Sequence, residues 1–246
     1  MAYIDGFVIP VKTADKQVFI AHAQRIDQFF IEFGGLRVVE AWGDDVPAGK
    51  ITDFARSVQA TAEETVVFSW VEWPDKATRD AAMKQFESNA ELMAEPMPFD
   101  GKRMIFGGFD TMVDANAKQG RDAAKAGYID GFVTPVPTAN QAAYRALADK
   151  AAAKFLAQGA IRSCENWGAD VPAGKVTDFM RSVMAQSDEV VVFSWVEWPD
   201  KATRNAGWEK IMADPEMQPA VMPFDGKRMV WGSFEPVYWV ARGANA

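Results

Sequence analysis

The stretch VVFSWVEWPDKATR at residues 66–79 occurs again, letter for letter, at residues 191–204. Its first eight residues are rich in the β-branched and aromatic side chains that favour strands. Pro74 restricts Trp73 to extended geometry, and Asp75 is placed to cap a helix. The stretch therefore predicts a strand that leads directly into a helix, twice in one chain.

The repeat extends over almost the whole chain. A constant offset of 125 residues carries Tyr3–Val8 onto Tyr128–Val133, and no gap is needed anywhere. Further matching pairs are Asp45–Lys50 with Asp170–Lys175 and Met97–Met104 with Met222–Met229. Such self-similarity indicates a tandem duplication of one unit. We predict a first unit at residues 1–113, a small and polar linker at residues 114–127, and a second unit at residues 128–246.

Each unit has the pattern of alternating strands and helices of a ferredoxin-like fold. A strand at residues 3–9 is expected to end at Pro10, because proline cannot donate a ladder hydrogen bond. A helix follows, then strands at 36–42 and 66–73, a second helix, a turn at 99–102 and a strand at 103–109. The order is βαββαβ, so the fold class is α+β. One sheet face stays bare, and we expect the two units to pack sheet to sheet as a pseudo-dimer within one chain.

Composition narrows the partners and the compartment. The 246 residues carry a formal net charge of −8 with scattered basic residues, which disfavours nucleic acid. No apolar run approaches the ~20 residues of a membrane helix, and the pattern starts at Tyr3 without a secretory leader. The single cysteine, Cys164, aligns with Val39 and is expected to be a small core residue. We therefore expect a cytoplasmic protein with no membrane partner.

Four segments resemble a known family: Tyr3–Val8, Asp44–Lys50, Val66–Trp73 and Met97–Ile105. They are similar to the DUF1428 family, the YbaA-like proteins, and the similarity spans each copy from end to end. The resemblance implies a dimeric α/β-barrel fold and no known activity. The chain departs from the usual single-unit form of that family because it carries two units, which together would form a pseudo-dimer capable of further oligomerisation.

The bare face of the sheet is where we expect a pocket. If Ile4 and Val8 pack under the helices, strand alternation turns Asp5 and Phe7 toward the barrel interior. The same reasoning directs acids and tryptophans of the neighbouring strands inward. The predicted pocket residues are Asp5, Phe7, Glu40, Trp42, Trp70, Glu72 and Arg103 in the first unit, and Asp130, Phe132, Glu165, Trp167, Trp195, Glu197 and Arg228 in the second.

Two interpretations of these acids stay open. Either Arg37 and Arg103 pair with these acids, or some of the acids lie at the barrel rim, where Glu72 is expected. The acids then form a structural ion-pair network or a ligand site. The connection at residues 43–64 is also ambiguous, because hairpin loops usually have ~2–5 residues. It is either a lid over the barrel mouth or an arm that packs on the other unit. The residues of the predicted lid are Lys50, Asp53 and Arg56, with Lys175, Asp178 and Arg181 in the second unit.

Recognisable catalytic motifs are missing from the sequence. The single histidine, His22, aligns with Leu147 and is expected to pack rather than to act as a general base. No pair of ligands has a recognised metal spacing, so we predict no metal and no cofactor. Two functions remain. The barrel binds a small, partly apolar organic molecule and transforms it without metal, or the chain is a non-enzymatic binding or interaction module with a filled barrel core.

Overall fold

The computed structural model describes residues 2–116, 126–217 and 221–243. The first unit contains strands β1 (Tyr3–Lys12), β2 (Arg37–Asp45), β3 (Glu64–Trp73) and β4 (Ile105–Asn116), and helices α1 (Lys16–Glu32), α2 (Phe54–Ser57), α3 (Lys76–Ser88) and α4 (Ala90–Ala94). The second contains strands β5 (Tyr128–Pro137), β6 (Arg162–Asp170), β7 (Glu189–Trp198) and β8 (Val230–Ala241), and helices α5 (Gln141–Ala157), α6 (Phe179–Ser182) and α7 (Lys201–Ala213). No helix among these residues is long and apolar enough to cross a membrane.

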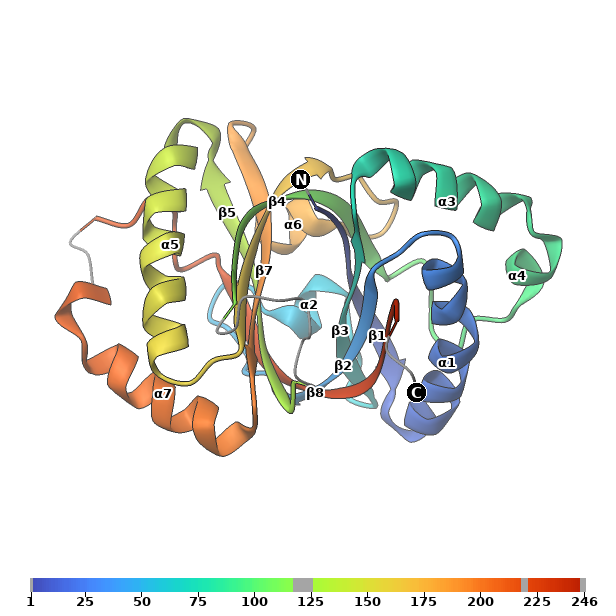
Figure 1. Ribbon diagram of the computed structural model, residues 1–246, viewed down its shortest axis with the longest axis horizontal. Helices are drawn as coiled ribbons and strands as arrows, with labels where there is room; N and C mark the ends of the chain where they lie inside the picture. Colours follow the sequence, from blue (N-terminus) through green and yellow to red (C-terminus); the bar gives the residue numbers. More distant parts are fainter. Residues whose placement is uncertain (1, 117–125, 218–220, 244–246) are drawn as a thin grey trace.

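The eight strands form one closed barrel in the order β1-β3-β2-β8-β5-β7-β6-β4. Each sheet is completed by the other at both edges, because β2 pairs with β8 and β4 pairs with β6. Helices α1 and α3 lie on one side of the barrel and α5 and α7 on the opposite side (Figure 1). The predicted α+β fold, two ferredoxin-like units in one intrachain barrel, is confirmed.

The repeated motif folds as its residues predict. Asp75 accepts a hydrogen bond from the backbone N–H of Thr78 at 2.8 Å and so caps α3. Two strand boundaries differ from expectation. β1 continues through Pro10 to Lys12, because its pairing with β4 ends at Val8 and proline is tolerated where one edge of a strand is free. β4 runs on to Asn116 and so enters the predicted linker, of which residues 117–125 lie outside the described residues.

Strand alternation in β1 is the reverse of the predicted one. Ile4 and Val8 belong to the barrel core, whereas Tyr3 and Phe7 pack under the helices. Gly6 explains this orientation, because a Cβ atom at that position would meet the ring of a phenylalanine from the second unit at 3.0 Å. The interior side of β1 therefore carries the smaller side chains and leaves room for rings from other strands.

Aromatic side chains fill the barrel interior. The rings of Phe68 and Phe193 stack with centroids 4.4 Å apart, and those of Trp70 and Trp195 stack at the same separation. All four residues are fully buried. The other large rings of this core are Phe54, Phe109, Phe179 and Phe234. These rings fill this part of the barrel, which favours the alternative of a filled core over a ligand inside the barrel.

Helices α2 and α6 join the two units within the long connections. Thr52 Oγ1 donates a hydrogen bond to the carbonyl oxygen of Ser182 at 2.6 Å, and Thr177 Oγ1 donates to that of Ser57 at 2.7 Å. Asp53 caps α2 by accepting a hydrogen bond from the backbone N–H three residues later. These connections therefore pack on each other as arms between the units.

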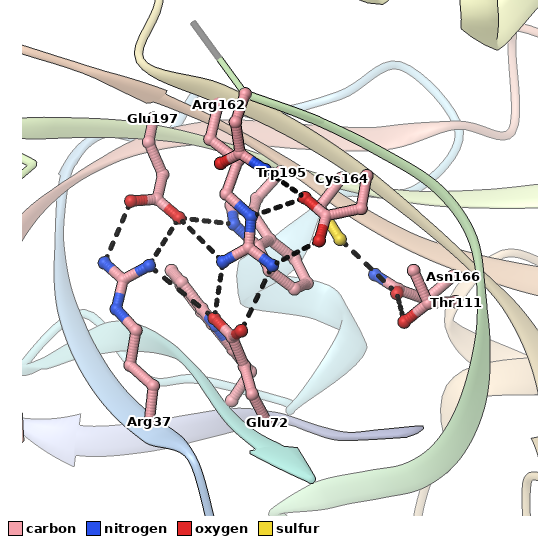
Figure 2. A network of polar contacts seen from close by, with 11 residues as sticks. Arg37, Glu72, Thr111, Arg162, Cys164, Asn166, Trp195 and Glu197 are labelled. Carbon is pink, nitrogen blue, oxygen red and sulfur yellow. Dashed lines mark hydrogen bonds and ion pairs between the residues drawn. The ribbon is translucent and has the colours of Figure 1, made fainter. Parts of the chain in front are cut away.

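Next to the stacked rings of Trp70 and Trp195, two buried arginine–glutamate pairs bridge the units (Figure 2). Arg37 donates two hydrogen bonds to Glu197, at 2.8 and 2.9 Å, and Arg162 donates two to Glu72, at 2.8 and 3.1 Å. Arg162 also contacts Asp114 at 2.7 Å. Burial alone raises the pKa of Glu72, but the two guanidinium groups lower it to about 2. At this layer of the barrel the acids form an ion-pair network.

We expect Arg37→Met to destabilise the protein by ~3–5 kcal/mol, because it removes both guanidinium hydrogen bonds of the fully buried Glu197 and leaves it only the more distant Arg162, at 3.7 Å. Urea denaturation measures this change. Arg145→Met is the control, since it removes an exposed pair with Asp149 that is worth less than ~1 kcal/mol. A loss from Arg37→Met as small as that of the control would contradict a structural role for the network.

Candidate functional site

A cavity of about 300 Å³ lies between the helices and the sheet of the first unit, outside the barrel core. This volume is at the lower end of the range for ligand pockets, roughly 300–1,000 Å³. Helices α1, α3 and α4, strands β1, β2 and β3, and the turn before β4 contribute its walls. Five phenylalanines line it, namely Phe7, Phe19, Phe30, Phe86 and Phe99. The cavity is therefore mainly apolar.

Two carboxyl groups, those of Asp27 and Glu40, interrupt this apolar wall. The residues are only 4% and 6% exposed. Glu40 Oε1 accepts a hydrogen bond from Ser69 Oγ at 2.7 Å, whereas Glu40 Oε2 and Asp27 Oδ2 are buried without a hydrogen-bond partner in the part of the chain described. We call Asp27 and Glu40 the carboxyl pair.

The local sequence explains how both acids reach the cavity. The buried residues of α1 are Phe19, Ala23 and Asp27, which are spaced by four residues and lie on one helical face. On β2, Glu40 lies between Val39 and Ala41, which both face the barrel core, so alternation turns Glu40 toward the helices. The signal for this site in the sequence is Asp27, an aspartate on the apolar face of the helix, and it was not recognised from the sequence.

Burial raises the pKa of both members of the carboxyl pair. Burial raises the pKa of Glu40 to about 8, and the hydrogen bond from Ser69 opposes this effect. Burial also raises the pKa of Asp27 well above its usual value, and the nearby charge of Glu40 raises it further. Near neutral pH the pair therefore retains a proton, so one member can donate while the other accepts.

The entrance of the cavity carries a small polar cluster. Arg25 donates a hydrogen bond to Glu95, and His22 Nδ1 lies 3.8 Å from the same carboxylate. The ring of His22 packs edge-on against Phe99, and its burial lowers its pKa. The predicted packing of His22 is thus seen, but the residue also lines the cavity. Leu92 of α4 closes the wall beside it.

The second unit lacks the carboxyl pair at the equivalent place. Ala152 occupies the position of Asp27, and Tyr144 occupies that of Phe19. Tyr144 Oη donates a hydrogen bond at 2.8 Å to Glu165, which is the counterpart of Glu40. Burial raises the pKa of Glu165 to about 7. Its carboxyl group is therefore satisfied within the protein, and only the first unit presents unpaired carboxyl oxygens to a cavity among the described residues.

The predicted pocket residues do not form one site. Those inside the barrel, as expected, are Trp70, Glu72, Trp195 and Glu197. Those on the helix side instead are Asp5, Phe7, Glu40, Trp42, Asp130, Phe132, Glu165 and Trp167. Of all these, Phe7 and Glu40 line the cavity. The inward orientation of the helix-side residues was wrong because the barrel core takes the opposite side of their strands.

Several predicted pocket acids and bases have other partners. Asp5 accepts hydrogen bonds from Trp73 and from Arg79 of α3, and so anchors that helix to the sheet. Asp130 holds α7 in the same way through Arg204. Arg103 and Arg228 pair with acids at the starts of β3 and β7, Glu64 and Glu189 respectively, rather than with acids in the barrel.

The predicted lid residues lie away from the cavity. Asp53 and Asp178 cap α2 and α6, and Arg56 and Arg181 donate hydrogen bonds to nearby backbone carbonyl groups. Lys50 lines a separate groove of about 540 Å³ at the boundary between the units, and Lys175 is exposed. No group of three or more His, Cys, Asp or Glu residues in the described ranges is arranged to hold a metal ion.

Comparison with known proteins places the chain in a family. A family model described as "Protein of unknown function (DUF1428)" matches residues 2–101 and again residues 127–226. The chain belongs to the DUF1428 family. The "Uncharacterized protein YbaA" of Escherichia coli strain K12 is 48% identical over 116 residues, which cover 46% of this chain and 99% of that protein. One relative of this length therefore corresponds to one of the two units.

Solved structures share the whole barrel. A "putative monooxygenase" from Lactobacillus acidophilus NCFM aligns with a TM-score of 0.58 and 11% identity, covering 99% of this chain and 98% of its own. An "anthrone oxidase-like protein" aligns with a TM-score of 0.54 and 12% identity, covering 100% and 95% of the two chains. At such low identity the likeness shows the fold alone.

Stability should respond to pH through Glu40. Its pKa rises from 4.5 to about 8 in the folded state, so the native state favours the protonated form. This contribution is complete below pH 4.5 and is lost as the pH rises to about 8. We expect Glu40→Gln to gain stability relative to wild type by up to ~1.4 kcal/mol per pH unit in this window, as measured by urea denaturation.

Glu165→Gln is the matched control for this pH dependence. The pKa of Glu165 is raised only to about 7, so its gain over wild type should level off at a lower pH. A stability difference between Glu40→Gln and wild type that stays constant from pH 5 to pH 8 would show that Glu40 titrates normally.

Proposed function

We propose that the first unit binds a small, largely apolar organic molecule in its helix–sheet cavity and exchanges a proton with it through the carboxyl pair. The observation that carries this proposal is the pair of buried carboxyl oxygens, Asp27 Oδ2 and Glu40 Oε2, that have no partner and border an apolar cavity. A buried polar atom without a hydrogen bond costs ~1–3 kcal/mol. A polar group on a ligand would satisfy both atoms.

The protonation state of the pair supports acid–base chemistry. A general acid or base works best when its pKa lies near the working pH, and burial moves the pKa of Glu40 to about 8. Perturbed carboxyl groups of this kind gather at functional sites because their burial is otherwise unfavourable. The apolar surroundings strengthen each polar contact that a bound molecule makes.

The filled barrel favours a supporting role for the second unit. Its strands complete the barrel, and its own carboxyl group at the equivalent position is satisfied by Tyr144.

The structural relatives whose printed names refer to a "putative monooxygenase" and to an "anthrone oxidase-like protein" are in keeping with a small organic substrate. The alternative function, a non-enzymatic binding module, keeps the same cavity but assigns no proton transfer to the pair.

The test converts the first site into the second. Phe19→Tyr combined with Asp27→Ala copies the residues of the second unit, where a tyrosine hydroxyl occupies the glutamate. We expect the double variant to fold, because the second unit packs this combination. It should bind the two-ring alcohol 2-tetralol at least ~10-fold more weakly than wild type, a loss of ~1.4 kcal/mol, as measured by calorimetry.

Glu165→Gln provides the control, because it alters the corresponding glutamate in the unit that lacks the pair. It should bind 2-tetralol as wild type does. Equal affinity of the double variant and wild type would refute the proposed site, and so would a wild-type protein that does not bind 2-tetralol. Circular dichroism of each variant establishes that it is folded.

A further inference from the structure

The cavity also points to a class of substrate. We infer that the carboxyl pair acts on a neutral carbonyl compound about two rings in size and moves a hydrogen between the carbonyl oxygen and the adjacent carbon. This inference rests on the proposed function, because it concerns the same cavity. It goes further by naming the substrate, the bond that changes and the role of each carboxyl group.

The volume of the cavity sets the size of the substrate. A protein cavity of ~150 Å³ lined by apolar side chains accommodates benzene. The cavity of the first unit, at about 300 Å³, has twice that volume. Phenylalanine rings from α1, β1 and α3 and from the turn before β4 surround it, so a planar body of about two rings can pack against them.

The charged groups around the cavity argue against an anionic substrate. The titratable residues that line it are Asp27, Glu40, Glu95 and His22, and no lysine or arginine is among the lining residues. Arg25 lies beside the entrance, but its guanidinium group is occupied by Glu95. A carboxylate or phosphate would therefore meet acids without a compensating cation, at a considerable desolvation cost.

The hydrogen bonds that the pair lacks indicate a carbonyl oxygen rather than an ammonium group. A protonated carboxyl group needs an acceptor, and a carbonyl oxygen has two lone pairs to offer. An ammonium ion would bring a further charge into the apolar cavity and favour ionisation of the pair, which burial opposes. A ketone or aldehyde satisfies the donor without placing any new charge in the cavity.

Ser69 distinguishes the two carboxyl groups. Its hydroxyl donates to Glu40 Oε1 at 2.7 Å, which opposes the effect of burial on the Glu40 pKa, makes Glu40 the easier of the two groups to ionise and leaves Oε2 free to act as a base. Asp27 Oδ2 receives no such hydrogen bond from the described residues, and the charge of Glu40 favours the protonated form of Asp27. Glu40 is thus the base, Asp27 the acid, and Ser69 a positioning residue.

The reaction balances without any further reactant. Glu40 Oε2 takes a proton from the carbon next to the carbonyl group, and the electron pair of that C–H bond forms a carbon–carbon double bond. The π electrons of the carbonyl group move to its oxygen, which takes the proton of Asp27. The product is an enol, and the pair holds the same number of protons as before. Return of a proton to carbon regenerates a ketone.

The experiment follows the exchange of carbon-bound hydrogen in 2-tetralone, a two-ring ketone, for deuterium in D₂O by NMR. Wild type should accelerate the exchange over buffer. Glu40→Gln and Asp27→Asn, which keep the size of each side chain, should each lower that acceleration at least ~100-fold, the range of general acid–base catalysis. Glu165→Gln should exchange at the wild-type rate. Equal acceleration by all four proteins would overturn the inference.

A matched ligand series separates failure of the inference from failure of the proposed function. It consists of tetralin, 2-tetralone, 2-aminotetralin and tetralin-2-carboxylate, and calorimetry gives the affinities. We expect 2-tetralone to bind most tightly of the four ligands. Tighter binding of the amine or the carboxylate, or binding of the ketone without exchange, overturns the substrate class but leaves the cavity as a binding site. Absence of binding by all four overturns both.

Discussion

Stacking of aromatic rings between the two units inside the barrel determines where every other part of the molecule can lie. The pairs Phe68–Phe193 and Trp70–Trp195 join the faces of the two sheets, and the arginine–glutamate pairs of the next layer fix them in register. Because these rings need space, β1 turns Gly6 inward and sends its larger side chains toward the helices. Space for a ligand is therefore found in the helix–sheet layer, outside the barrel.

Duplication within one chain allows the two units to differ. In a symmetric dimer of one gene product, both subunits carry the same site. Here the barrel needs the second unit for strand pairing and ring stacking, but these needs leave its helix–sheet layer free to vary. Tyr144 and Ala152 occupy that layer in place of Phe19 and Asp27. The second unit can thus supply stability while the first retains the unsatisfied acids.

The sequence predicted the architecture better than the site, for physical reasons. The exact repeat, the Asp75 cap and the strand order each depend on local pattern, and the closed barrel follows from two bare sheet faces. Which side chains of β1 point into the barrel depends instead on which face of the strand must accommodate the rings of the other unit. Strand alternation alone does not decide between the two faces. Asp27 was not singled out from the sequence, because its burial becomes evident only when α1 packs over Glu40.

The second unit also shows that the unpaired acids of the first are not forced by the fold. The same backbone accommodates a tyrosine whose hydroxyl satisfies the glutamate, and an alanine in place of the aspartate. Two substitutions would therefore remove the cost of burying the carboxyl pair. Proteins usually break the rule of satisfied buried polar groups at functional sites and compensate elsewhere in the structure. The barrel core supplies this compensating stability, because its stacked rings are fully buried and do not line the cavity. An unfavourable pair retained where a favourable alternative fits is better explained by use than by chance.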